Sequence, residues 1–187
     1  SDVMSYAYEG TNLFEGYAVD TFSTVAALYM EQVQIVTCDP EIKTVADLEG
    51  KNVSIGAPGS GVYFNAIDIL DAYDLTEEDI TPTYESFGDS VDSLQDGKID
   101  AAFIVAGAPT PAITELCTTN DAYLVPIDGE IAAKITESSP FYTTYDIPAG
   151  TYPKQDTDVT TVTVKATLIV SASATEDDVY NLTKAIF

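Results

Sequence analysis

The stretch Val53–Leu70, VSIGAPGSGVYFNAIDIL, decides the fold class because it predicts a strand, a tight turn and a helix in direct succession. The apolar face of the helix is expected to continue over residues 62–73 and to be buried. A strand that passes through such a turn into a helix directs backbone N–H groups toward one point, where the helix dipole adds partial positive charge. The N–H groups of Ser60, Gly61 and Val62 therefore predict an anion site.

The glycine pattern of this turn favours a carboxylate over a nucleotide. Its glycines lack the spacing of a dinucleotide fingerprint, and the GK[ST] of a phosphate loop is absent. An alternative stays open from the residues alone: Gly59 and Gly61 turn the chain, and Ser60 only caps the helix.

Charge and composition narrow the classes of partner. The 187 residues include 31 acidic side chains and 7 basic ones, all lysine, and the net charge is −24. Binding to nucleic acid phosphates or to an anionic membrane surface would be strongly opposed, so neither is an expected partner.

The chain contains no histidine and no arginine. Without histidine, the usual general base and the commonest transition-metal ligand are missing, so we expect no enzyme activity, no metal site and no cofactor. Cys38 and Cys117 have no imidazole partner and are expected to be two buried free thiols, although one disulfide is the alternative. Without arginine, a bound carboxylate must rely on backbone N–H groups, hydroxyls or lysine.

Strands and helices alternate along the chain, which predicts a parallel α/β sheet with right-handed crossovers. The segment 99–105 is a continuous apolar strand of the kind that is covered on both faces. The segment 138–158 has no sustained period and is expected to be an ordered loop. Further strands are predicted over 25–30, 33–37, 53–55, 82–87, 122–127 and 160–170, and helices over 1–8, 44–47, 62–73, 89–96, 112–118, 129–137 and 175–187.

Several segments, in this order along the chain, carry a resemblance to a known family. They are IKTVADLEGKNVSIGAPGSG, KIDAAFIVAGAPTPAITEL, VPIDGE, SPFY, IPAGTYPKQD and TVTVKATLIV. Together they resemble the TAXI-type solute receptors of TRAP transporters, over essentially the whole chain. The resemblance implies a type II periplasmic-binding-protein-like α/β fold, with two lobes of parallel-rich sheet flanked by helices and a ligand cleft between the lobes.

The resemblance also implies a map of the two lobes. Residues 33–38 and 159–170 would be crossing strands, and residues 39–158 would form lobe II as an intact α/β domain. Residues 1–32 and 171–187 would be parts of lobe I. Relative to the family, the chain is expected to lack roughly the first half of that lobe and its final helices.

Ligands in such folds bind at the carboxyl ends of strands, where helix N-termini converge. Three turns meet this condition: 57–62, 107–110 and the start of the chain. A helix cap is the alternative role for Thr110, and a core aromatic is the alternative for Tyr8. The predicted ligand-binding residues are Ser60, Gly61, Val62, Gly59, Gly107, Thr110, Ser1 and Tyr8.

The function that the resemblance implies is capture of a small carboxylate without chemistry. The ligand would be an amino- or keto-dicarboxylate such as glutamate or 2-oxoglutarate, delivered to TRAP membrane subunits by a monomeric extracytoplasmic protein, periplasmic or a cell-surface lipoprotein. One alternative is the effector-sensing domain of a transcription regulator. Another is an enzyme on the same fold, such as a tetrapyrrole-forming deaminase, which would need an arginine-rich cleft that this sequence cannot build.

Overall fold

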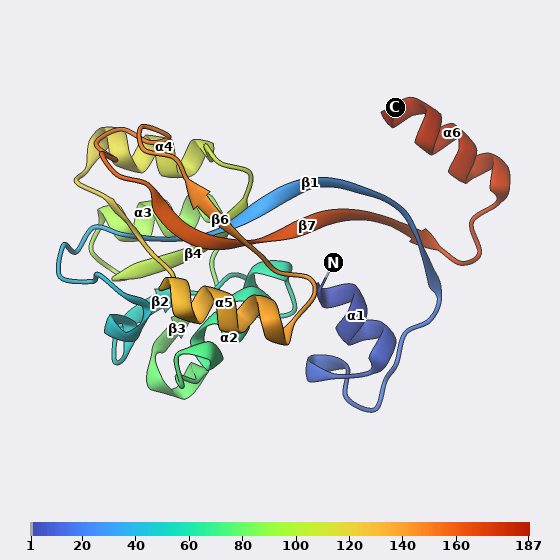
Figure 1. Ribbon diagram of the computed structural model, residues 1–187, viewed down its shortest axis with the longest axis horizontal. Coiled ribbons are helices and arrows are strands. Elements are labelled where there is room, and N and C mark those ends of the chain that lie inside the picture. The colour runs from blue at the N-terminus through green and yellow to red at the C-terminus, as the bar shows by residue number, and fades with distance from the viewer. Residues whose placement is uncertain (1) are drawn as a thin grey trace. The chain divides into compact units, whose positions relative to one another are not determined.

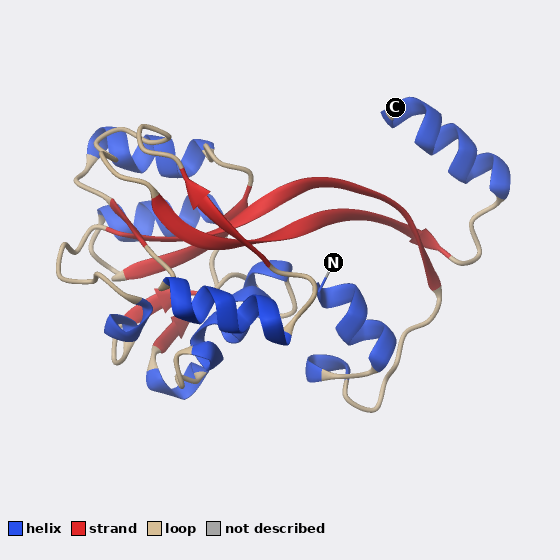
Figure 2. Cartoon of the chain, in the orientation of Figure 1, coloured by secondary structure: helices blue, strands red, loops and turns tan. Residues whose placement is uncertain are grey.

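The computed structural model describes residues 2–187 (Figures 1 and 2). The chain divides into two compact units, Glu31–Val164 and Ser1–Met30 with Lys165–Phe187. The strands are β1 (Phe22–Thr37), β2 (Asn52–Ser54), β3 (Thr81–Thr83), β4 (Ala101–Ala106), β5 (Tyr123–Val125), β6 (Thr143–Ile147) and β7 (Val159–Ser171). The helices are α1 (Asp2–Glu9), η1 (Asn12–Phe14), η2 (Val45–Leu48), α2 (Gly61–Ala72), η3 (Glu77–Asp79), α3 (Phe87–Gln95), α4 (Pro111–Thr119), α5 (Gly129–Ser138) and α6 (Glu176–Ile186).

The sheet is mixed, with strand order β3-β2-β4-β1-β7-β6 and β5 paired to β1. Parallel pairing joins β2 to β3 and to β4, whereas β1 runs antiparallel to β4 and β5, and β6 runs antiparallel to β7. The expectation of a parallel sheet is therefore right for β2, β3 and β4 and wrong for the other strands. An apolar run shows that a strand is buried on both faces but does not show the direction of its neighbours.

The core of the larger unit, Glu31–Val164, lies on both faces of β4, as its continuous apolar run predicts. Ala101, Phe103 and Val105 belong to one buried cluster, whereas Ala102 and Ile104 belong to a second. Helices α2 and α5 contribute side chains to the first cluster, and α3 and α4 contribute to the second. The two pairs of helices lie on opposite sides of the sheet of the larger unit (Figure 1). Side chains alternate along β4 because successive Cβ atoms point to opposite faces of a sheet.

Three segments differ from the sequence-based expectations by more than a shift of one or two residues at their ends. The two segments 25–30 and 33–37 are one continuous strand, β1. The strand expected over 82–87 ends at Thr83, because the Ser86 side chain accepts a hydrogen bond from Asp89 N and so begins α3. The expected loop 138–158 contains β6, which pairs with β7 although most of its residues are exposed. An exposed edge strand needs no apolar alternation, so its sequence carries little signal.

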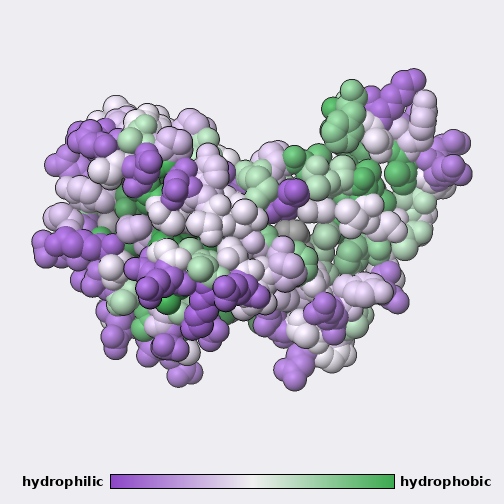
Figure 3. Space-filling model, in the orientation of Figure 1, coloured by the Kyte–Doolittle hydropathy of each residue, from purple (hydrophilic) through white to green (hydrophobic). Residues whose placement is uncertain are grey.

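The smaller unit, Ser1–Met30 with Lys165–Phe187, has almost no buried side chains. Among its described residues, only Asp2 and Ala7 are buried. Large apolar side chains are exposed along its strands and on α6 (Figure 3). A two-stranded ribbon with single helices does not bury enough apolar surface for independent stability. The exposed apolar residues of this unit include Leu13, Tyr17, Leu28, Tyr29, Ile169, Tyr180, Ile186 and Phe187.

Candidate functional site

The carboxyl ends of three parallel strands lie at one edge of the sheet in the larger unit. Strand β2 pairs with β3 on one side and with β4 on the other, and each of the three strands leads into a helix. Ser60, Ser86 and Thr110 are the N-cap residues of these helices, α2, α3 and α4. The structure thus brings two of the predicted turns, 57–62 and 107–110, to the same edge.

The turn before α2 leaves two of the three predicted N–H donors open. The Ser60 N–H donates to Ala57 O at 2.9 Å, and the Ser60 Oγ accepts from Tyr63 N at 3.2 Å. The N–H groups of Gly61 and Val62 lie in the first turn, where a helix offers no acceptor, and no other group within residues 2–187 accepts them. The helix cap and a pair of open donors therefore coexist in this turn.

Two glycines with positive φ shape this turn in different ways. Gly56 has a φ of +76°, and a Cβ built on it would lie 2.8 Å from Val62 Cβ and 3.1 Å from Ser60 Oγ. Gly59 has a φ of +78° but open space around the same position. Gly56 therefore lets the strand end lie directly against the first turn of α2, a role that sequence analysis did not assign. Its only sequence signal is its place immediately after the apolar strand.

The turn before α4 is held by buried side chains from β1 and from the loop after β6. Gln34 Nε2 donates to Thr110 Oγ1 at 2.9 Å and to Ala106 O at 3.2 Å. The Tyr152 hydroxyl donates to Gln34 Oε1 and accepts from Thr110 N at 2.9 Å. Thr110 Oγ1 in turn donates to Gly107 O at 3.1 Å. Thr110 is 5% exposed, so a ligand contact through it would have to replace one of these bonds.

Two further groups complete this network. Gln32 Oε1 accepts from Ala108 N at 2.8 Å, and Tyr152 is 2% exposed. Burial raises the pKa of Tyr152, and hydrogen bonding with Thr110 opposes that rise, so the hydroxyl stays a neutral donor near pH 7. Sequence analysis gave no role in this network to Tyr152, Gln32 or Gln34. The available signal was a glutamine at a buried position of an apolar strand.

Buried oxygens without a partner lie at the end of β3. Thr83 Oγ1 and Glu85 Oε2 are buried and make no hydrogen bond within the described chain. Thr83 pairs with Ser54 in the parallel ladder, so Glu85 follows β3 as Gly56 follows β2. A buried carboxylate oxygen is costly when unpaired, and it could accept a hydrogen bond from a cationic or N–H group of a ligand.

A tyrosine and glutamate cluster flanks the first turn of α2. The Tyr63 hydroxyl donates to Glu77 Oε2 at 2.8 Å, and the Tyr84 hydroxyl donates to the other carboxylate oxygen. Burial and the Glu77 carboxylate raise the pKa of Tyr63 to about 12. Both carboxylate oxygens of Glu77 are thus occupied by phenolic donors.

Two predicted ligand-binding residues do not belong to the larger unit. Ser1 lies outside the described residues. Tyr8 lies on α1 of the smaller unit and is 63% exposed. Their roles in binding stay predictions.

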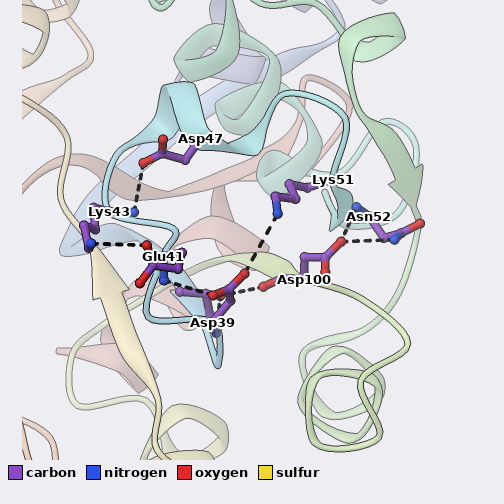
Figure 4. A network of polar contacts seen from close by, with 8 residues as sticks. Asp39, Glu41, Lys43, Asp47, Lys51, Asn52 and Asp100 are labelled. Carbon is purple, nitrogen blue, oxygen red and sulfur yellow. Dashed lines mark hydrogen bonds and ion pairs between the residues drawn. The ribbon is translucent and has the colours of Figure 1, made fainter.

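The opposite edge of the same strands carries a self-contained polar network (Figure 4). Asp100 Oδ2 accepts from Asn52 N at 2.7 Å and from Asn52 Nδ2 at 3.0 Å, and Lys51 Nζ lies 3.9 Å from Asp39 Oδ2. Exposed ion pairs of this kind contribute at most about 1 kcal/mol each to the free energy of unfolding. Charged groups at that edge are satisfied by one another, whereas the carboxyl edge keeps open donors and an unpaired acceptor.

Within residues 2–187, no group of three or more cysteine, aspartate or glutamate side chains is arranged to hold a metal ion. No helix in the same range is both long enough and apolar enough to span a bilayer.

A family model described as the NMT1-like family matches residues 1–187. The chain belongs to the NMT1-like family. This membership supports the solute-binding character of the resemblance, and the narrower TAXI assignment stays a prediction.

Solved structures identify the fold of this NMT1-like chain. The periplasmic aliphatic sulphonate binding protein SsuA from Escherichia coli matches with a TM-score of 0.50 and 20% identity, over 87% of this chain and 41% of that chain. A variant of arginine-bound ArgBP from T. maritima matches with a TM-score of 0.50 and 14% identity, over 89% of this chain and 61% of that chain. The fold is therefore that of type II periplasmic binding proteins, as predicted, and the chain spans less than two thirds of each of these proteins.

Proposed function

We propose that this NMT1-like chain belongs to an extracytoplasmic protein that binds a small carboxylate and performs no chemistry. The observation that carries this proposal is the pair of open N–H groups of Gly61 and Val62 at the carboxyl edge of β2. A helix N-terminus stabilises negative charge through its unpaired donors and its dipole. The similar fold of SsuA and ArgBP, whose names give a sulphonate and arginine as their ligands, supports a small-molecule ligand.

The ligand class that we propose is a dicarboxylate with an amino group, such as glutamate. A net charge of −24 disfavours anions in general, so an anion must be held by local donors. Glu85 brings a buried, unpaired carboxylate oxygen to the same edge, and that oxygen would repel a ligand without a compensating cation. We therefore expect glutamate to bind more tightly than 2-oxoglutarate, its keto counterpart.

In this proposal the protein acts as a monomer and delivers its ligand to the membrane subunits of a TRAP transporter. The sequence resemblance to TAXI-type receptors supports this partner. The absence of histidine and arginine from the sequence supports binding without catalysis.

The test is calorimetric titration of the full natural polypeptide with glutamate and with 2-oxoglutarate, for the wild type, Ser60→Asp and Ser60→Asn. Aspartate and asparagine are both good N-caps, so both variants should melt close to the wild-type temperature. Only aspartate adds a negative charge beside the open donors, and we expect it to weaken binding by about tenfold or more. Asparagine should leave the affinity within about threefold of wild type.

Wild-type affinity in Ser60→Asp with a normal melt would mean that the anion does not bind at this turn. Binding of 2-oxoglutarate as tight as that of glutamate would contradict the role proposed for Glu85. If neither compound binds or raises the melting temperature, the dicarboxylate class is wrong.

A further inference from the structure

The two cysteines are far apart in the sequence but belong to one region of the larger unit. Cys117 lies on α4, is 4% exposed and is part of the buried cluster on the α3 and α4 face of the sheet. Cys38 follows β1 directly, is half-buried and packs against the same cluster. Both thiols are unpaired in the structure.

Strand register brings the end of β1 to the chain that leaves α4. Thr37 pairs with Tyr123 as the last pair of the antiparallel ladder of β1 and β5, and Cys38 and Ala122 are the residues next to that pair. Ala122 packs against the same cluster as Cys38 and Cys117. Helix α4 ends at Thr119, only a short turn before Ala122. The last turn of α4 and the residue after β1 therefore contribute to the same buried cluster.

The electrostatics of the two thiols agree with this geometry. Burial raises the pKa of Cys117, and the Cys38 thiolate raises it further, while Lys154 opposes the rise. Burial also raises the pKa of Cys38, with a smaller contribution from Asp121. Charge interactions between groups of this kind weaken with distance, so the effect of Cys38 on Cys117 agrees with their place in one cluster.

We propose that Cys38 and Cys117 form a disulfide when the protein meets a small-molecule disulfide oxidant. The Cys38 thiolate, on the more exposed residue, attacks one sulfur of the oxidant, forms a mixed disulfide and releases one thiolate. The Cys117 thiolate then attacks Cys38 Sγ, which forms the internal bond and releases the second thiolate. The two cysteine protons pass to the two released thiolates, so the cysteines are oxidised and one disulfide is reduced to two thiols.

This disulfide would crosslink the end of β1 to α4 within the larger unit. A crosslink between residues so distant in the sequence restricts the unfolded chain strongly and stabilises the folded one. Because the pKa values of both thiols are raised, the reaction should be slow at neutral pH. It should accelerate by up to about tenfold for each pH unit below the thiol pKa.

The experiment is incubation of the folded, reduced chain with oxidised glutathione, followed by thiol titration in denaturant and intact-mass measurement. We expect titratable thiols to fall from two to none, with loss of two hydrogen atoms and no retained glutathione. The oxidised protein should melt about 5–10 °C above the reduced one. Two remaining thiols, or a glutathione adduct that persists on the wild type, would overturn the proposal.

Single variants separate the two steps. Cys117→Ser should hold a stable glutathione adduct on Cys38, because the resolving thiol is gone. Cys38→Ser should react far more slowly, because Cys117 is buried. Equal adduct formation on both variants would contradict the order of attack, and a wild-type melting temperature insensitive to oxidation would contradict the crosslink.

Discussion

The turns after β2 and β4 lie at the same edge of the sheet, and each leads from a parallel strand into a helix. They differ in how their polar groups are hydrogen-bonded. The turn after β2 is held by its own residues, with glycine at positive φ and the Ser60 side chain as helix cap, and it leaves the N–H groups of Gly61 and Val62 open. The turn after β4 is shaped by Gln34 and Tyr152, which bond to Thr110 from outside the turn. The same sequence signal thus accompanies a turn with open N–H donors in one place and a turn whose polar groups are bonded to other side chains in the other.

The largest loss of folding stability is expected from Gly56→Ala in the turn after β2. Alanine at this positive φ costs about 1–2 kcal/mol, and its Cβ would lie 2.8 Å from Val62 Cβ, which adds about 1–3 kcal/mol of overpacking. Gly59→Ala is the matched control, because Gly59 has nearly the same φ but nothing within 4 Å of the added atom. Urea unfolding should show Gly56→Ala as the more destabilised variant. Equal losses would mean that only the backbone conformation of Gly56 matters.

A smaller loss of folding stability is expected from Tyr152→Phe, beside the turn after β4. Removal of the hydroxyl leaves Gln34 Oε1 and Thr110 N without this partner in a buried setting, which should cost about 1–3 kcal/mol. Tyr145→Phe on β6 is the control, since Tyr145 is 40% exposed, and it should change stability by less than about 0.5 kcal/mol.

The variant Tyr152→Phe should affect ligand affinity differently from folding stability. If the turn after β4 only supports its surroundings, Tyr152→Phe should leave glutamate affinity close to wild type. A loss of affinity comparable to that of Ser60→Asp would place the β4 turn in the binding site and remove the contrast between the two turns.

The sequence predicts the elements of the larger unit better than their pairing. Helices α2, α3, α4 and α5 lie within two residues of their expected bounds, because caps and apolar periodicity are local signals. Strand β6 was missed, since it is an exposed edge strand held by β7 rather than by its own pattern. The antiparallel direction of β1 depends on contacts with β4 and β5, which no local pattern encodes.

The same distinction holds for the candidate site. The sequence GSG of residues 59–61 is a local signal that predicted the cap and two of the three proposed donors of α2, whereas the Ser60 N–H donates to Ala57 O. The bond between Tyr152 and Gln34 joins residues 118 positions apart and could not be predicted before the register of β1 was known. Thr110 was therefore predicted to bind the ligand only from its position before a helix. Its buried hydrogen-bond partners were found in the structure.

The smallest expected effect is on the pH dependence of stability and concerns Tyr63. This residue lies in the first turn of α2 beside the open donors. Its pKa of about 12 exceeds the usual value of 10.0, so the folded chain holds the phenolic proton more tightly than the unfolded chain. The resulting stability is present below pH 10 and is lost as the pH rises toward 12. Tyr63→Phe should therefore flatten the alkaline fall in the free energy of unfolding, relative to wild type.

Glu77→Gln then separates the two causes of this shift. Burial is the larger cause, so the pKa of Tyr63, measured by ultraviolet titration, should fall only part of the way toward 10 when the carboxylate is neutralised. Tyr84 also donates to Glu77 but is 47% exposed, so the fall of the Tyr84 pKa in Glu77→Gln reports the effect of the same carboxylate with little burial. A full return of Tyr63 to a pKa of 10 in Glu77→Gln would mean that charge, and not burial, governs this flank of the turn after β2.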